Sequence, residues 1–258
     1  PYSLGVHARD VHQPKFCLPR LLGQARFVTA CNEAARRAVL AACPGLGQRL
    51  HLIPHGVDLK AWPFRREAYA PHGDLRLFWA GRFVEKKGID TLLRALASLT
   101  RSGVPAAVYL AGSGPLEASL RALAHDLGVD HCVEWLGVLP HERVRQTLRT
   151  LDCLVVPSCV SRDGDRDGIP NIVLEAMAVG VPVVGTTAGG LGEVLNAQTG
   201  WVFPPADAEA LAGLLRTVSA DLREVERRRL AARALVQERY DAERLASQRV
   251  ALFRELLR

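Results

Sequence analysis

The sequence predicts an α/β protein built mainly on a doubly wound parallel sheet. From about residue 75 onward, short apolar segments with strand character alternate with amphipathic helical segments. Repeated strand–helix units of this kind give a parallel sheet with helices on both faces. The chain has 258 residues, of which 48% are hydrophobic. This length and composition allow one such domain with a sizeable core and leave a shorter first segment.

The expected strands are short apolar runs punctuated by glycine or proline. They cover residues 75–80, 106–111, 133–136, 153–156, 181–185 and 201–203. The expected helices carry apolar residues at helical spacing and cover residues 88–99, the segment after Pro115, 141–150 and 172–179, followed by two long helices. Right-handed crossovers between these units make the domain Rossmann-like.

The first 55 residues do not show the regular strand–helix alternation of the rest of the chain. Residues 1–55 hold a His-Ala-Arg-Asp segment, a proline-punctuated stretch, two strands and a helix, which are too few elements to close a domain alone. We therefore interpret 1–55 as the end of a preceding domain, 56–240 as the main domain and 241–258 as a closing helix. Because the chain begins with Pro1 rather than Met, we expect a fragment or a processed chain.

The charge balance is basic, with a formal charge of +6 and a pI near 9.3. Arginine and glutamate are interleaved along 221–239 rather than gathered in one basic stripe, and aromatic residues make up only 6%, so we expect no nucleic-acid partner. No apolar run is long enough to span a bilayer, and the start does not resemble a signal peptide. We expect a cytoplasmic protein, with weak peripheral attraction to the inner membrane left open.

The six cysteines show neither a Cys-x-x-Cys pair nor the spacing of a zinc site or a disulfide scaffold. They are Cys17, Cys31, Cys43, Cys132, Cys153 and Cys159. We interpret them as buried, reduced thiols and expect no metal.

A cationic loop follows the first strand of the main domain and reads GRFVEKKG over residues 81–88. Ligands of doubly wound sheets bind beyond the carboxyl ends of the strands. Arg82 and Lys87 are therefore placed to converge on an anion. The guanidinium of Arg82 would donate two parallel hydrogen bonds, and the ammonium of Lys87 would act as a point charge. The alternative is a pair of solvated loop cations.

A glycine turn, Gly112-Ser113-Gly114, follows the next strand and precedes Pro115. Glycines at a strand-to-helix turn let a phosphate approach the backbone closely. The turn lacks both the G-x-G-x-x-G pattern and the P-loop lysine, so a plain tight turn is the alternative.

Two acids flank one helix start in the segment DGIPNIVLEAMA, residues 167–178. With Asn171 as the expected N-cap, Asp167 lies in the loop and Glu175 about one turn into the helix. The free N–H groups of that turn favour a phosphate or diphosphate, and carboxylates accept hydrogen bonds from sugar or ribose hydroxyls. The alternative for Glu175 is an acid that only complements the helix dipole.

In this order the segments resemble the C-terminal half of a GT-B glycosyltransferase of the retaining family 4 type (glycosyltransferase group 1). The resemblance covers about residues 50–258 and includes that family's E-x7-E acid pair, here Asp167 and Glu175. The first acid is one methylene shorter than the family's Glu. The other matching segments are GRFVEKKG, Gly112-Ser113-Gly114-Pro115, Trp135-Leu136-Gly137 and Gly189-Gly190 with Glu193. The segment GDRDGIP at 164–170 resembles the branch that builds bacterial exopolysaccharides and lipopolysaccharides.

The resemblance implies a role for each matching residue. Arg82 and Lys87 would neutralise the diphosphate of the donor. Asp167 would contact the donor sugar, and Glu175 would hold the ribose hydroxyls. His7, in the His-Ala-Arg-Asp segment, would be the active-site histidine of the acceptor-binding domain. The remaining donor-site residues implied are Gly112, Leu139 beside the nucleobase, Gly168, Ile169, Asn171 and Ile172.

The activity implied is transfer of a hexose from a UDP- or GDP-sugar to a polysaccharide or lipid-linked acceptor, with retention of the anomeric configuration and without a metal or other cofactor. Because 1–55 holds only the end of the acceptor domain, we expect donor binding with little turnover. Two alternatives stay open, a non-catalytic nucleotide-sugar binding module that serves a partner subunit and a sugar-nucleotide epimerase. On the closing helix we expect partly exposed apolar side chains, namely Leu245, Val250, Phe253 and Leu257.

Overall fold

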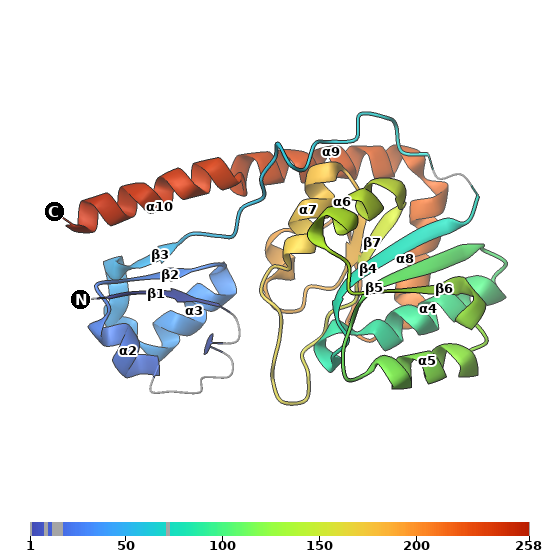
Figure 1. The fold of residues 1–258 in the computed structure, drawn as a ribbon, viewed down its shortest axis with the longest axis horizontal. Coiled ribbons are helices and arrows are strands. Elements are labelled where there is room, and N and C mark those ends of the chain that lie inside the picture. Colours follow the sequence, from blue (N-terminus) through green and yellow to red (C-terminus); the bar gives the residue numbers. More distant parts are fainter. Residues whose placement is uncertain (1, 8–9, 12–17, 71–72, 258) are drawn as a thin grey trace.

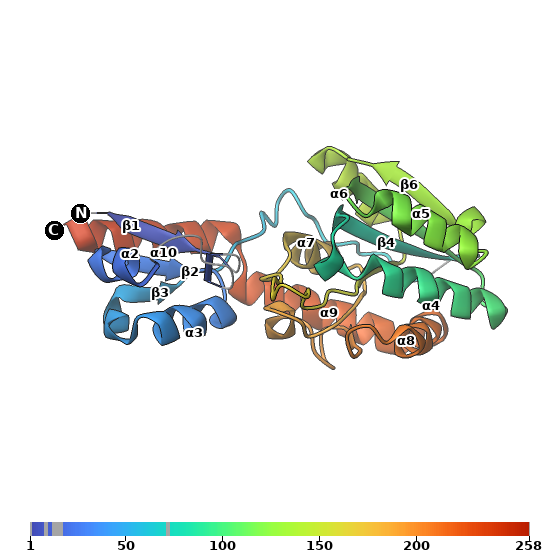
Figure 2. The same cartoon turned by 90° about the horizontal axis from the view of Figure 1, so that it is seen from below.

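The computed structural model describes residues 2–7, 10–11, 18–70 and 73–257 and contains two parallel sheets (Figure 1). An extended linker joins the two sheets, and a long C-terminal helix returns over the smaller one (Figures 1 and 2). We call the part built on the smaller sheet the small lobe and the part built on the larger sheet the large lobe. Within these described residues, no helix is both long and apolar enough to span a bilayer.

The small lobe holds a parallel sheet in the order β1-β2-β3 within the described residues. Its elements are β1 (Ser3–Val6), α2 (Leu18–Gln24), β2 (Phe27–Ala30), α3 (Glu33–Ala42), a 3₁₀ turn (Pro44–Arg49) and β3 (Leu50–Leu52). Neither β1 nor α2 was expected. The apolar signal of β1 is only four residues long, and Pro19 and Gly23 obscure the helical pattern of α2.

The large lobe confirms the doubly wound fold. In the described residues its sheet has the order β6-β5-β4-β7-β8-β9, and every pair is parallel. The strands are β4 (Leu75–Arg82), β5 (Ala106–Ser113), β6 (Val133–Gly137), β7 (Cys153–Val156), β8 (Val183–Gly185) and β9 (Trp201–Val202). The chain lays β5 and β6 on one side of β4 and β7 to β9 on the other. The carboxyl end of β4 is therefore the topological switch point, where such sheets bind ligands.

Helices cover both faces of this sheet (Figure 2). They are α4 (Ile89–Arg101), α5 (Glu117–Asp126), α6 (His141–Thr150), α7 (Asn171–Val179), α8 (Ala208–Ala220) and α9 (Leu222–Arg239). Leu77 and Trp79 of β4 face the apolar cluster shared with α4, α5 and α8, whereas Phe78 faces the cluster shared with α6, α7 and α9. This alternation gives the lobe one apolar core on each face of the sheet.

Two strands run further than expected. β4 continues to Arg82 and β5 to Ser113, and Gly81 pairs with Gly112 in the extended register. A Cβ on Gly112 would lie only 1.8 Å from the carbonyl oxygen of Gly81. Because both residues lack a side chain, the ladder continues through them, and Arg82 ends a strand instead of starting a loop.

The expected N-cap of α7 was wrong. Asn171 is the first helical residue, and Pro170 is the cap, with no side-chain hydrogen bond. The carbonyl of Pro170 already accepts a hydrogen bond from the N–H of Val173 at 3.0 Å, and its fixed φ leads the chain into the helix.

The C-terminal segment holds three helices where two were expected, since α10 (Ala242–Leu257) follows α8 and α9 in the fully described stretch 208–257. Asp221 separates α8 from α9 by capping the N–H of Glu224. After α9, Val57 of the linker bonds to the backbone of Tyr240 and Ala242. These hydrogen bonds attach the linker to the segment between α9 and α10.

The expectation for the apolar side chains of α10 was partly wrong. Leu245 is only 6% exposed, whereas Val250 is 48% and Phe253 41% exposed. Phe253 packs edge-on against Phe27 of β2, with ring centroids 5.1 Å apart. The side chain of Leu257 lies outside the described residues.

The cysteines are less buried than expected. Of the five that the structure describes, all are free and Cys153 alone is buried. The partly buried ones are Cys31, Cys43, Cys132 and Cys159. Cys17 lies outside the described residues.

Candidate functional site

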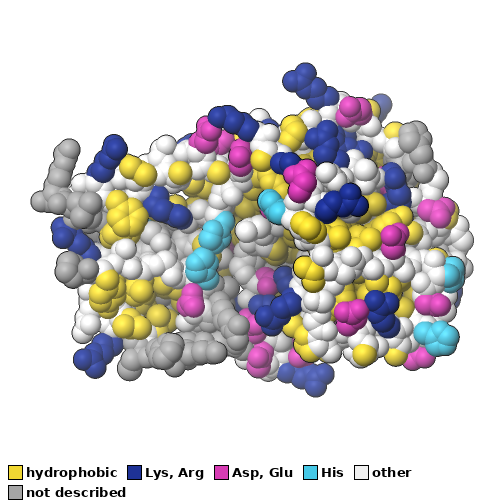
Figure 3. All heavy atoms as spheres, in the orientation of Figure 1, with side chains coloured by type: hydrophobic (Ala, Val, Ile, Leu, Met, Phe, Trp, Pro, Cys, Tyr) yellow, Lys and Arg dark blue, Asp and Glu magenta, His cyan; other side chains and the backbone are white. Residues whose placement is uncertain are grey.

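A pocket between the two lobes gathers much of the predicted site. It is lined by His7, Cys31, His55, Lys86, Lys87, Arg166, Asp167, Gly168, Ile169, Pro170 and Asn171. Histidine side chains are visible along the groove between the lobes (Figure 3). The small lobe thus faces the N-terminus of α7 and the loop before it across one opening.

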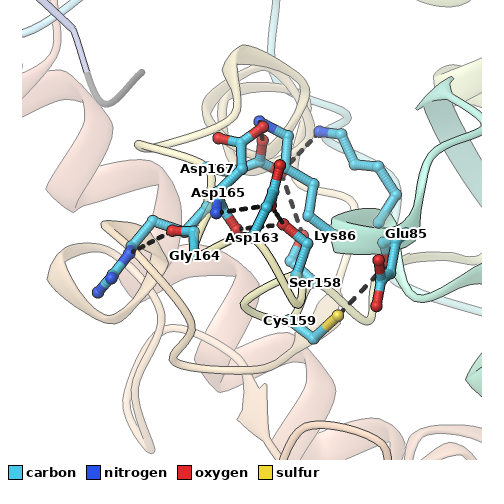
Figure 4. A network of polar contacts seen from close by, with 11 residues as sticks. Glu85, Lys86, Ser158, Cys159, Asp163, Gly164, Asp165 and Asp167 are labelled. Carbon is cyan, nitrogen blue, oxygen red and sulfur yellow. Dashed lines mark hydrogen bonds and ion pairs between the residues drawn. The ribbon is translucent and has the colours of Figure 1, made fainter. Parts of the chain in front are cut away.

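A compact cluster of ion pairs borders this pocket (Figure 4). The Lys87 ammonium lies 2.7 Å from Oδ2 of Asp167. Lys86 lies 3.3 Å from Oδ1 of Asp167 and 3.0 Å from Oδ2 of Asp165. The Ser158 hydroxyl also donates to Asp167, at 3.3 Å. Because Lys87 is 17% exposed and Asp167 only 13%, their charges are screened less than those of an open surface pair.

The lysines are held by a close backbone approach. Gly88, which follows the 3₁₀ turn Glu85–Lys87, has φ +59°, and a Cβ there would lie 1.9 Å from the carbonyl oxygen of Pro157. The N–H of Cys159 donates to the carbonyl of Lys86 at 2.8 Å. The turn that carries both lysines is therefore clamped against the loop that follows β7.

Asp167 is held by the Gly189-Gly190 turn. The N–H of Gly190 donates to the carbonyl of Asp167 at 3.2 Å. Gly189 has φ +65°, and a Cβ there would lie 1.9 Å from that same carbonyl oxygen. These contacts give a physical reason for the two glycines, which the sequence showed only as part of a motif.

Arg82 and Gly112 lie at the neighbouring ends of β4 and β5. Arg82 is exposed and lines a second opening together with Lys87 and Asp167. Gly112 packs against the backbone of Gly81, so close strand packing alone requires a glycine there.

Glu175 lies apart from the lysine cluster. Its carboxylate, on a side chain that is 13% exposed, lies 3.0 Å from Nε2 of His141 at the start of α6. The ring of His141 also packs edge-on against Trp62, with ring centroids 5.3 Å apart. Leu139 and Ile172 are partly buried and pack against the apolar cluster around α7.

His7 meets a second histidine. Its Nδ1 lies 3.2 Å from Nε2 of His55, and the rings stack with centroids 5.0 Å apart. The backbone N–H of His7 donates to Asp10 at 2.9 Å. Partial desolvation of the His55 ring, together with the nearby His7 and Arg249, lowers its pKa from the ordinary value, although the residue is exposed.

Glu193 joins the lobes by a different contact. Its carboxylate accepts hydrogen bonds from the N–H groups of Glu33 at 2.9 Å and Ala34 at 3.0 Å. The next free N–H of α3, that of Ala35, is capped by Asn32 at 2.7 Å. The N-terminus of α3 is thus satisfied partly by an acid of the other lobe.

Sequence reasoning missed several of these contacts. Lys86 and Asp165 lay within motifs already singled out, but no pattern marked them as partners. His55 and His141 belong to none of the motifs singled out, and no periodicity distinguishes them from ordinary surface histidines.

Comparison with known proteins identifies the family. The family model described as "Glycosyl transferases group 1" matches residues 61–235. The amylovoran biosynthesis glycosyltransferase AmsK of Erwinia amylovora is 31% identical over 238 residues, which are 91% of this chain and 57% of the relative. The putative colanic acid biosynthesis glycosyltransferase WcaL of Escherichia coli is 35% identical over 178 residues, 69% of this chain and 43% of the relative. The chain thus spans about half the length of these curated relatives.

Solved structures show the same fold. Sucrose-phosphate synthase from Thermosynechococcus elongatus superposes with a TM-score of 0.78 and 27% identity, over 93% of this chain and 60% of that one. HepE from Anabaena, in complex with UDP and glucose, superposes with a TM-score of 0.82 at 20% identity, over 98% of this chain and 71% of that one. The resemblance to glycosyltransferase group 1 is confirmed, and the chain belongs to the group 1 glycosyltransferases of GT-B fold.

Proposed function

We propose that the protein to which this chain belongs transfers a hexose from a nucleoside-diphosphate sugar to a growing glycan or a lipid-linked acceptor. One observation carries the proposal. The ammonium of Lys87, the carboxylate of Asp167 and the N-terminus of α7 line a single pocket that His7 also faces. That pocket combines positive groups for a diphosphate with acceptors for hydroxyls.

The leaving group of this reaction is a nucleoside diphosphate, and its charge grows as the sugar departs. Lys87, Lys86 and Arg82 supply cations beside the pocket, and the first turn of α7 supplies backbone N–H groups. Fixed cations and amides stabilise developing negative charge in the way a metal ion otherwise does. We therefore propose a reaction without a divalent metal.

Asp167 changes partner in this scheme. A bound diphosphate competes with its carboxylate for the Lys87 ammonium, which lies 2.7 Å from Oδ2. Once Lys87 turns to the phosphates, Oδ2 of Asp167 gains an acceptor position for a sugar hydroxyl, while Lys86 and Ser158 still contact the carboxylate. Glu175, whose carboxylate faces His141, is proposed to take the ribose hydroxyls.

His7 approaches the pocket from the small lobe, opposite Lys87 and Asp167. We place it beside the sugar that is transferred. Retention of the anomeric configuration is proposed because the acid pair Asp167 and Glu175 resembles that of retaining transferases. The names of AmsK and WcaL, given for amylovoran and colanic acid biosynthesis, support a role in exopolysaccharide assembly.

A donor panel tests this function. UDP-glucose, UDP-galactose and GDP-mannose, each radiolabelled in the sugar, are incubated with the whole protein and a membrane extract that supplies acceptors. Incorporation of label into glycan or lipid from one of them, undiminished by EDTA, is the expected result. Binding of a donor without incorporation would instead favour the nucleotide-sugar binding module, and conversion to another free nucleotide sugar would favour an epimerase.

A further inference from the structure

Three side chains with metal-binding atoms come from successive strands of the small lobe. His7 directly follows β1, Cys31 directly follows β2 and His55 lies shortly after β3. Because the sheet is parallel with the order β1-β2-β3, all three strands end at the same edge. The topology therefore brings together residues that are far apart in the chain.

Their donor atoms are close enough to share one ion. The ring nitrogens and the thiol sulfur all lie within 4.8 Å of one another. Nδ1 of His7 and Nε2 of His55 are 3.2 Å apart. Two imidazole nitrogens bound to one tetrahedral Zn²⁺, at about 2.0–2.1 Å each, stand about 3.3 Å apart. The histidine pair already has nearly that separation.

We propose that His7, Cys31 and His55 form a binding site for a borderline transition-metal ion, with Zn²⁺ as the best match. Two imidazole nitrogens and one thiolate are a donor set that zinc prefers, whereas Mg²⁺ and Ca²⁺ prefer oxygen ligands. Three protein ligands leave the fourth tetrahedral position for water or another small ligand. All three residues line the pocket that Lys87 and Asp167 also line.

The surroundings suit such a site. His7 and His55 are exposed and Cys31 is partly buried, so an ion reaches the donor atoms from the groove between the lobes. A bound ion displaces the thiol proton of Cys31, as it does at other cysteine ligands. The proposal concerns ion binding alone and does not depend on the transferase reaction.

Metal titration of the chain, freed of any affinity tag, tests the site. We expect one Zn²⁺ or Co²⁺ to bind per chain, and the cobalt complex to show a thiolate-to-cobalt charge-transfer band. Cys31→Ser abolishes that band, and Cys31→Ser and His55→Ala each weaken binding by at least about tenfold, since even partners beyond the ligands change affinity by ~10–100-fold. The matched controls Cys159→Ser and His131→Ala, which alter a partly buried thiol and an exposed histidine of the large lobe, leave affinity unchanged.

A second measurement needs no variant. Zn²⁺ is expected to slow alkylation of Cys31 by iodoacetamide and to leave that of Cys159 in the same chain unaffected, as followed by mass spectrometry. Equal alkylation of Cys31 with and without Zn²⁺, or wild-type metal affinity in both Cys31→Ser and His55→Ala, overturns the proposal.

Discussion

The carboxylate of Glu193 lies 2.9 Å from the backbone nitrogen of Glu33, and this contact ties the large lobe to the first turn of α3. Removing it with Glu193→Ala leaves two helix N–H groups without this charged acceptor. We expect the free energy of unfolding to fall by about 1–2 kcal/mol. Denaturant unfolding measures the loss.

The matched control for this change is Glu142→Ala. Glu142 is an exposed acid paired with Arg145 on the same helix, and such a surface pair contributes only about 0–1 kcal/mol. If the two variants lose equal stability, the contact between the lobes does not stabilise the fold.

The two acids of the candidate site should affect different ligands. Glu175 is proposed to hold the ribose, which UDP and UDP-sugar share. Glu175→Gln is therefore expected to weaken both ligands alike, by about 1–3 kcal/mol for a lost charged hydrogen bond. Calorimetric titration of each ligand into the variant checks this, and a loss confined to one ligand would refute the assignment.

Asp167→Asn is expected to weaken binding of the sugar-bearing donor and not of free UDP. The substitution removes the charge that competes for Lys87, so free UDP binds at least as well as before. The sugar loses a carboxylate acceptor, so the affinity advantage of UDP-sugar over UDP decreases. An unchanged ratio of the two dissociation constants, together with a lower melting temperature, would make Asp167 a residue of stability only.

Gly189 allows a further test of how Asp167 is positioned. An alanine there would have φ +65° and a Cβ 1.9 Å from the Asp167 carbonyl oxygen. Gly128 has nearly the same φ, +69°, but a Cβ on it would meet no atom of the described residues within 4 Å beyond its chain neighbours. Gly128→Ala should cost only the left-handed strain of about 1–2 kcal/mol, whereas Gly189→Ala should cost more and also weaken donor binding. Equal losses in both variants, with donor affinity intact, would show that the contact does not position Asp167.

The contribution of His55 to the stability of the fold should depend on pH. Partial desolvation and the nearby His7 and Arg249 lower the pKa of His55 in the folded state, so folding favours the neutral ring. The resulting contribution to stability is complete above the unfolded pKa of about 6.5 and is lost as the pH falls through the lower folded pKa. In buffer with EDTA, the melting temperature of wild type relative to His55→Gln is therefore expected to fall between about pH 7.5 and pH 5. A difference that does not change with pH would contradict this.

The fold of the large lobe was largely predictable because its local signals agree. Residues 141–150 and 153–156 were predicted with the observed bounds, since the amphipathic run begins directly after Pro140 and the fully apolar run ends directly before Pro157. β1 was missed because four residues of mixed polarity carry too little pattern. Arg229 looked like one more arginine of a solvated helix but is 1% exposed and donates to the linker backbone.

The site was predictable only where a motif carried it. The sequence marked Lys87 and Asp167, and the structure places them in contact. It did not mark Lys86, because neighbouring lysines in a turn look equivalent until the chain folds. It also did not pair His7 with His55, because that contact depends on the pairing of three strands across 48 positions.

The central claim is that Lys87 holds the diphosphate of the donor without a divalent metal. Calorimetric titration of UDP and GDP in EDTA, into wild type, Lys87→Ala and Lys60→Ala, tests it most directly. Lys60 is an 80% exposed lysine that pairs with Glu243 outside the pocket. We expect nucleotide to bind in EDTA, Lys60→Ala to match wild type and Lys87→Ala to bind at least about tenfold more weakly, since a charge-assisted hydrogen bond contributes about 1.5–3 kcal/mol. Unchanged affinity in Lys87→Ala, or binding abolished by EDTA, would contradict the claim.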